Sequence, residues 1–145
     1  MPERETLERA KEDAREGKSP STQAGEFVRE EIHHVREGKH GVRSPQQAIA
    51  IGLSKARRAG VKLPPKGSSS TRKKAAQDTR KSRSKSKPSR TRSRATEAAL
   101  KKEPRSTAGR AALSRQAKKS AASRGKQARS QAAKKAANTR ARRAA

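Results

Sequence analysis

The sequence predicts an all-α fold, in which a small N-terminal module of two to three helices precedes a long, mostly disordered basic tail with transient helices. Two observations lead to this fold class. Only 28% of the 145 residues are hydrophobic and Phe27 is the sole aromatic residue, so the chain cannot bury enough apolar surface to order its whole length. Charge also divides the chain: residues 1–65 carry 13 Lys/Arg and 10 Asp/Glu, whereas residues 66–145 carry 27 and 3.

Helices are predicted at about residues 2–15 and 20–37 of the module, which spans residues 1–65. Ser19 can cap the second helix, Pro20 suits its first position, and a glycine follows each helix as a stop signal. The second helix has the stronger apolar stripe, with residues recurring at three- and four-residue spacing: Ala24, Phe27, Val28, Ile32 and Val35.

The third predicted helix, at about residues 45–59, has a start signal, an apolar face and a stop signal together. Ser44 and Gln47 have capping-box spacing, Pro45 suits the first helical position, and Gly60 can adopt the left-handed stop. The residues that share its apolar face are Ala48, Ile49, Gly52, Leu53, Ala56 and Ala59. This helix is expected to anchor the module.

The tail divides by composition into residues 66–94, rich in Ser, Lys and Arg, and residues 95–145, rich in Ala, Lys and Arg. Serine competes for backbone hydrogen bonds and like charges repel, so the first segment is predicted to be a disordered linker. Alanine, Lys and Arg favour helix, but no apolar face supports one. The second segment is therefore expected to be disordered, or helical when bound.

Two resemblances follow from particular segments. Residues 26–60, and above all Gln47–Gly60 (QAIAIGLSKARRAG), resemble an uncharacterised family of small basic bacterial proteins with a QAIAIALSEARRAG-like signature; Gly52 and Lys55 depart from it. This resemblance implies a bacterial origin and a short helical module, with no established activity. The Lys/Ala-rich tail resembles the arms of linker histones and bacterial histone-like proteins, which implies nonspecific DNA binding.

The net charge of +27 indicates a polyanionic partner. Basic residues spread singly and in pairs between Ala and Ser can follow a phosphate backbone and release its counterions. The tail residues predicted to contact DNA phosphates are Arg72, Lys73, Lys74, Arg80, Lys81, Arg83, Lys85, Lys87, Arg90, Arg92, Arg94, Lys101, Lys102, Lys118, Lys119, Arg124, Lys126, Lys134, Lys135, Arg140, Arg142 and Arg143. The sequence therefore predicts sequence-independent DNA binding by a histone-like, nucleoid-associated protein.

Two features of the module could add contacts. Lys39 and Arg43 lie in the loop before the third helix, where backbone amides and the helix dipole favour an anion, and are predicted as auxiliary phosphate contacts. The alternative is that Ser44 satisfies those amides and the charges are solvated. The polar side of the third helix resembles a recognition helix, but the preceding loop is long and the second helix is acidic, which disfavours sequence-specific readout.

Other functions find less support in the sequence. No arrangement of nucleophile and base or glycine-rich phosphate loop indicates an enzyme or a cofactor. His33, His34 and His40 are expected to bind no metal, because neighbouring histidines on a helix diverge and neither Cys nor a fixed carboxylate completes a ligand set.

Three alternatives concern partners. An RNA- or ribosome-associated protein would have a similar basic tail, and the module could instead recruit a protein partner to nucleic acid. A homodimer through the module would supplement its small core.

The charged start and the lack of a long apolar run predict a cytoplasmic, nucleoid-associated protein with no membrane contact.

Overall fold

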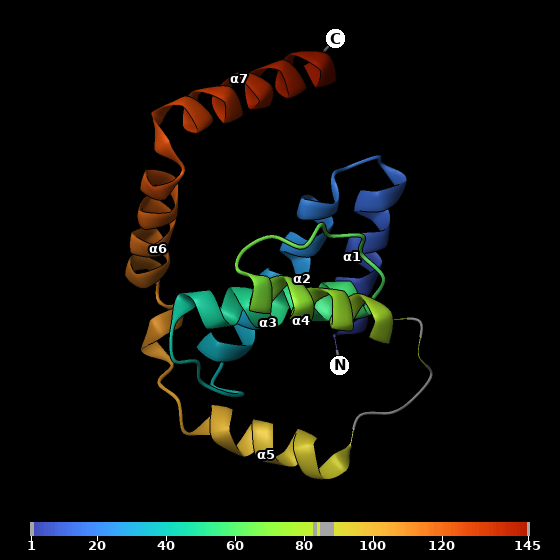
Figure 1. The fold of residues 1–145 in the computed structure, drawn as a ribbon, viewed down its shortest axis with the longest axis vertical. Coiled ribbons are helices and arrows are strands. Elements are labelled where there is room, and N and C mark those ends of the chain that lie inside the picture. The colour runs from blue at the N-terminus through green and yellow to red at the C-terminus, as the bar shows by residue number, and fades with distance from the viewer. Residues whose placement is uncertain (1, 83, 85–88, 145) are drawn as a thin grey trace. The chain divides into compact units, whose positions relative to one another are not determined.

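The computed structural model describes residues 2–82, 84 and 89–144, and its regular structure there is entirely helical (Figure 1). The chain forms two compact units, Met1–Gly109 and Arg110–Ala145. The elements of the first unit are α1 (Arg4–Arg15), α2 (Pro20–Arg36), α3 (Pro45–Arg58), α4 (Ser69–Lys81), α5 (Arg90–Lys101) and the short 3₁₀-helix η1 (Ser106–Ala108). The second unit contains α6 (Arg110–Ser123) and α7 (Gly125–Ala144).

Serine caps begin three of these helices. The hydroxyl oxygens of Ser19, Ser44 and Ser68 each accept a hydrogen bond from the backbone N–H three residues later, at 3.4, 3.2 and 3.3 Å. At α3, Gln47 Oε1 accepts from the backbone N–H of Arg43 at 2.7 Å, one residue before the position in a standard capping box. The bounds of α1, α2 and α3 lie within two residues of the predicted ranges.

Two small clusters form the core of the first unit. Phe27 of α2, 1% exposed, packs with Ala10 of α1, Ala24 and Ala56. The second cluster joins α2, α3 and η1 through Val35, Val42, Ala48 and Ala108. Because Ala108 is fully buried, the segment after α5 belongs to the fold of the first unit.

Helix α3 is the centre of this unit, since α2, α4 and η1 all contact it. Gly52 lets α2 approach closely: a Cβ at this position would lie 2.6 Å from Val28 Cα. On another side, Asp78 of α4 accepts hydrogen bonds from Ser54 Oγ at 2.7 Å and Arg58 Nε at 3.0 Å. Asp78 is 4% exposed, so these bonds hold α4 against α3.

The prediction of a mostly disordered tail is wrong. Helices α4, α5, α6 and α7 cover most of residues 66–144. Alanine, Lys, Arg and Gln have high helix propensity, and in α4 a serine cap and the buried contacts of Ala75 and Asp78 add to it. Helix propensity, capping and buried contacts together outweigh the repulsion between like charges. Part of the predicted coil, residues 83 and 85–88, lies outside the described residues.

Candidate nucleic-acid interface

The first set of predicted phosphate ligands lies on α4. Ala75 and Asp78 are buried, whereas Lys73, Lys74 and Arg80 are exposed. Lys73 and Arg80 are seven residues apart, as are Lys74 and Lys81, so each pair repeats along the helix at about 10 Å. Arg72 is exposed as well. Because the buried side of α4 packs on α3, the cations of α4 face solvent.

Helix α5 carries further exposed cations of the first unit. The exposed residues there are Arg90, Arg92, Arg94, Lys101 and, just after the helix, Lys102. Lys101 pairs with Glu97 at 2.8 Å, and its hydrogen bond and charge lower the pKa of Glu97. Among the described residues of the predicted tail set, Lys101 is the one that forms an ion pair.

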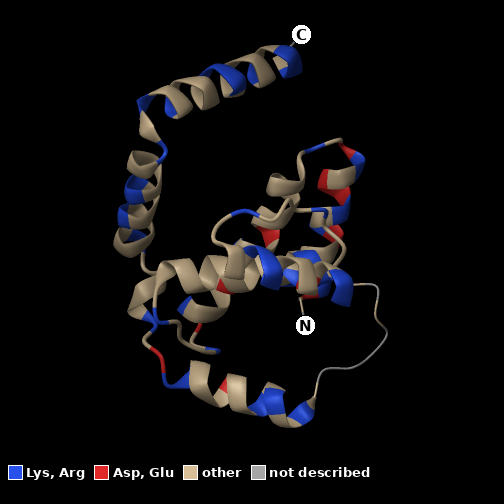
Figure 2. Ribbon diagram, viewed as in Figure 1, with Lys and Arg blue, Asp and Glu red and all other residues tan. Residues whose placement is uncertain are grey.

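The second unit has twelve Lys/Arg and no Asp/Glu. Figure 2 accordingly shows blue but no red segments on α6 and α7. The predicted residues in this unit are all exposed: Lys118, Lys119, Arg124, Lys126, Lys134, Lys135, Arg140, Arg142 and Arg143. On α7 the cations point in several directions around the helix axis, so the whole helix surface is basic rather than one face.

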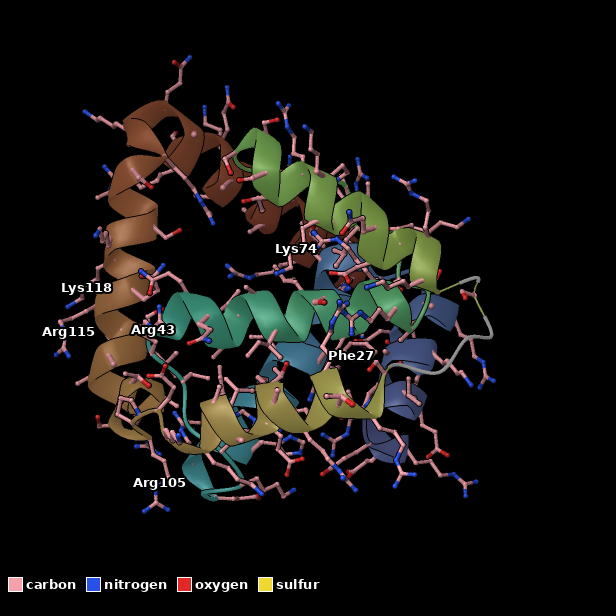
Figure 3. All side chains as sticks on the ribbon, turned by 60° about the horizontal axis from the view of Figure 1, so that its bottom comes forward. Phe27, Arg43, Lys74, Arg105, Arg115 and Lys118 are labelled. Atoms are coloured by element: carbon pink, nitrogen blue, oxygen red, sulfur yellow. The ribbon has the colours of Figure 1, made fainter. Side chains whose placement is uncertain are left out.

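The predicted set omits further cations. Arg110, Arg115 and Arg129 are exposed on α6 and α7. Arg115 and Lys118 are three residues apart and extend from the same side of α6 (Figure 3). Helical spacing on the Ala-rich segment was the signal that could have identified Arg115. Three predicted residues, Arg83, Lys85 and Lys87, lie outside the described residues.

The loop with the auxiliary contacts is engaged within the chain. The backbone N–H groups of Gly41 and Val42 donate to the carbonyl oxygens of Leu100 at 2.9 Å and Pro104 at 3.0 Å. Thr107 Oγ1 donates to the Val42 carbonyl at 2.7 Å. These amides are therefore occupied by the end of α5 and by the segment that follows it.

The two cations of this loop also have carboxylate partners. Lys39 Nζ lies 3.0 Å from Glu3 Oε1 and 3.2 Å from Glu37 Oε2, and these hydrogen bonds raise the pKa of Lys39. Arg43 Nη2 lies 3.4 Å from Glu103 Oε1. Neither residue is brought together with the exposed cations of α4.

The polar side of α3, which resembles a recognition surface in the sequence, is partly covered by α4 and α2. Ser54 and Arg58 bind Asp78 of α4, and Lys55 contacts Glu30 and Glu31 of α2 at 3.2 and 2.8 Å. A helix whose polar side chains are held in this way cannot enter a DNA groove unless α4 moves away. The same contacts with α4 and α2 also bury much of the α3 surface that a protein partner would bind.

The structure also groups three possible metal ligands. Glu31, His34 and His40 place one ligand atom each within 4.8 Å of one another. The sequence alone predicts no fixed carboxylate beside these histidines. Glu31 supplies one because the loop after α2 turns back and brings His40 to it.

One protein-family profile, described as a family of unknown function (DUF6496), matches residues 16–67, about a third of the chain. This stretch includes α2 and α3, so that part of the chain is similar to the family. No curated protein and no solved structure matches the chain. Among the described helices, none combines the length and apolar character needed to cross a membrane.

Proposed function

We propose that this protein binds duplex DNA without sequence preference and acts as a nucleoid-associated, histone-like protein. The contacts are made between DNA phosphates and the exposed cations of α4 and α5 in the first unit and of α6 and α7 in the second. One observation carries the proposal: the predicted tail cations among the described residues are exposed, and nearly all of them lack a carboxylate partner.

The charge density of α7 suits this function. Its 20 residues span about 30 Å. Seven Lys/Arg lie on that length, about one per 4 Å, against a duplex that carries one phosphate per about 1.7 Å. The cations on the side of α7 that faces the duplex can therefore each find a phosphate, and the released counterions favour binding.

Base recognition has no comparable support. Phe27, the sole aromatic residue of the chain, is buried, so no aromatic side chain can stack on an unpaired base. This favours a duplex over a single strand. An RNA- or ribosome-associated function remains the alternative, since phosphate contacts alone distinguish the two duplex types weakly.

Binding is tested by fluorescence anisotropy with two duplex DNAs of unrelated sequence, one RNA duplex of equal length and one single strand. The proposal predicts equal affinity for the two DNAs and weaker binding of the single strand. Tighter binding of the RNA duplex would contradict DNA as the partner and support the RNA-associated alternative. A preference for one DNA sequence would contradict sequence-independent binding.

A matched pair of variants tests the assignment of the interface. Lys134→Gln/Lys135→Gln removes two cations from α7, and Lys11→Gln/Arg15→Gln removes two exposed cations from α1. The net charge changes equally in both. The slope of log affinity against log salt should become shallower by about 2 in the α7 variant and stay unchanged in the α1 variant. Equal effects would show that net charge alone matters.

A further inference from the structure

We propose that Glu31, His34 and His40 form a binding site for one divalent transition-metal ion, with zinc as the ion that best suits the ligands. Glu31 and His34 lie one turn apart on α2, and His40 comes from the loop that follows this helix. Two imidazoles and one carboxylate are a ligand set that zinc sites in proteins use.

The distances fit a first coordination shell. The three ligand atoms lie within 4.8 Å of one another. His40 Nε2 lies 3.2 Å from Glu31 Oε1. Two ligands of a tetrahedral zinc ion with bonds of about 2.0 Å lie about 3.3 Å apart. An ion placed between these two atoms would thus need little movement of either residue.

The Glu31 carboxylate gives an independent reason for a ligand. It is 1% exposed; Lys55 Nζ lies 2.8 Å from Oε2, whereas Oε1 has the His40 imidazole 3.2 Å away and accepts no hydrogen bond from the described residues. A buried carboxylate oxygen without a hydrogen bond is costly, and a cation bound at Oε1 would lower that cost.

Lys55 does not replace the ion. Its Nζ lies 2.8 Å from Glu31 Oε2 and 3.2 Å from Glu30 Oε1, on the other side of the carboxylate from His40. Two buried carboxylates thus share one ammonium group, which leaves an excess negative charge beside Oε1.

The surroundings of the histidines also fit metal binding. His40 Nδ1 lies 3.0 Å from the carbonyl oxygen of Gly41, to which it can donate, and this leaves Nε2 as the nitrogen that would bind an ion. Glu3 Oε1 lies 2.8 Å from His34 Nε2 but does not belong to the cluster of three ligands, so water would fill the fourth position of the ion. The side chains of His34 and His40 are 13% and 15% exposed, so the site lies near the surface, where an ion can enter.

The test is a calorimetric titration of the full chain, free of any affinity tag and dialysed against chelator, with zinc chloride. The chain has three histidines and no cysteine, so competing sites are few. We expect one zinc ion per chain with a Kd in the micromolar range or below. His34→Ala and His40→Ala should each weaken binding at least about tenfold.

His33→Ala is the matched control, because His33 is exposed on the same helix and lies outside the cluster. It should leave the zinc affinity unchanged. Far-UV circular dichroism checks that each variant folds, and His40→Gln replaces His40→Ala if the latter does not. Cobalt(II) should give the intense visible absorption of a four-coordinate site.

The proposal is overturned if the wild-type chain shows no saturable zinc binding, which would identify the cluster as an internal ion-pair network. It is also overturned if His33→Ala weakens binding as much as His40→Ala, because that would indicate nonspecific surface coordination.

Discussion

At the scale of single residues, Gly52 determines how closely α2 and α3 pack. Alanine in a helix is favoured over glycine by about 1 kcal/mol. Against this, a Cβ at Gly52 would lie 2.6 Å from Val28 Cα and 2.9 Å from Val28 N, which are backbone atoms that cannot move alone. Overpacking of this kind costs about 1–3 kcal/mol, and here it should exceed the gain in propensity.

Gly52→Ala is therefore expected to lower the free energy of unfolding by up to about 2 kcal/mol, measured by urea denaturation. The matched control is Gly25→Ala on α2, where an added Cβ meets nothing within 4 Å. This control should raise stability by about 0.5–1 kcal/mol. If both substitutions stabilise the protein alike, the close contact with Val28 is not present.

Lys18 provides a prediction on pH dependence. Hydrogen bonds to Asp13 at 2.7 Å and Glu16 at 2.6 Å raise the pKa of Lys18 above its usual value of 10.5. A raised pKa in the folded state means that the pair stabilises the fold fully below 10.5 and that this contribution is lost as the pH rises further.

The stability difference between wild type and Lys18→Met should accordingly be constant from neutral pH to about pH 10 and shrink above it. The urea midpoint measures this difference at each pH. Lys11→Met, which removes an exposed lysine of α1, should show no such decline. A difference between wild type and Lys18→Met that stays constant above pH 10.5 would argue against the pair.

At the scale of helices, the three N-terminal elements could be predicted because their signals are local. Ser19 and Ser44 before prolines, and apolar residues at helical spacing, act within a few residues of each helix start. The position of α4 could not be predicted in this way. It depends on Asp78 meeting Ser54 and Arg58 across 20 or more residues.

A signal for α4 was nonetheless present in the tail. Its three acidic residues, Asp78, Glu97 and Glu103, each pair with a basic residue of the first unit: Arg58, Lys101 and Arg43. A rare carboxylate in a strongly basic segment indicates a specific internal partner. The metal-ligand cluster lacked even this signal, because it requires the path of the loop that brings His40 to Glu31.

Asp78→Ala should release α4 from α3, since Ser54 and Arg58 lose their acceptor. Hydrogen bonds to a buried carboxylate contribute about 1.5–3 kcal/mol, so amides of α4 should exchange at least tenfold faster. Native-state hydrogen exchange measures this helix by helix. Gln77→Ala, an exposed change on α4, is the control. Unchanged protection of α4 in Asp78→Ala would refute the docking role.

At the scale of the whole molecule, the chain combines a nearly charge-balanced N-terminal part with strongly basic helices. Residues 1–65 have a net charge of +3 and residues 66–145 one of +24. The acidic side chains of α2 are used internally, for example by Glu30 and Glu31 with Lys55. This division of charge was visible in the sequence, whereas the helical order of the basic part was not.

The second unit offers a direct test, because Arg110–Ala145 contains twelve Lys/Arg and no acidic residue. A chain that ends at Gly109 keeps the first compact unit and loses these cations. Comparison of this chain with the full protein separates binding by α6 and α7 from binding by the first unit, which keeps the cations of α4 and α5.

The most direct measurement is the dependence of duplex-DNA affinity on salt concentration for both chains. If the full chain engages about ten phosphates, log affinity should fall with log salt at a slope of about −9, and the shorter chain should bind more weakly with a clearly shallower slope. A full-chain slope near zero would contradict DNA binding by the basic helices, and equal affinity and slope for the two chains would contradict the proposed contacts of α6 and α7.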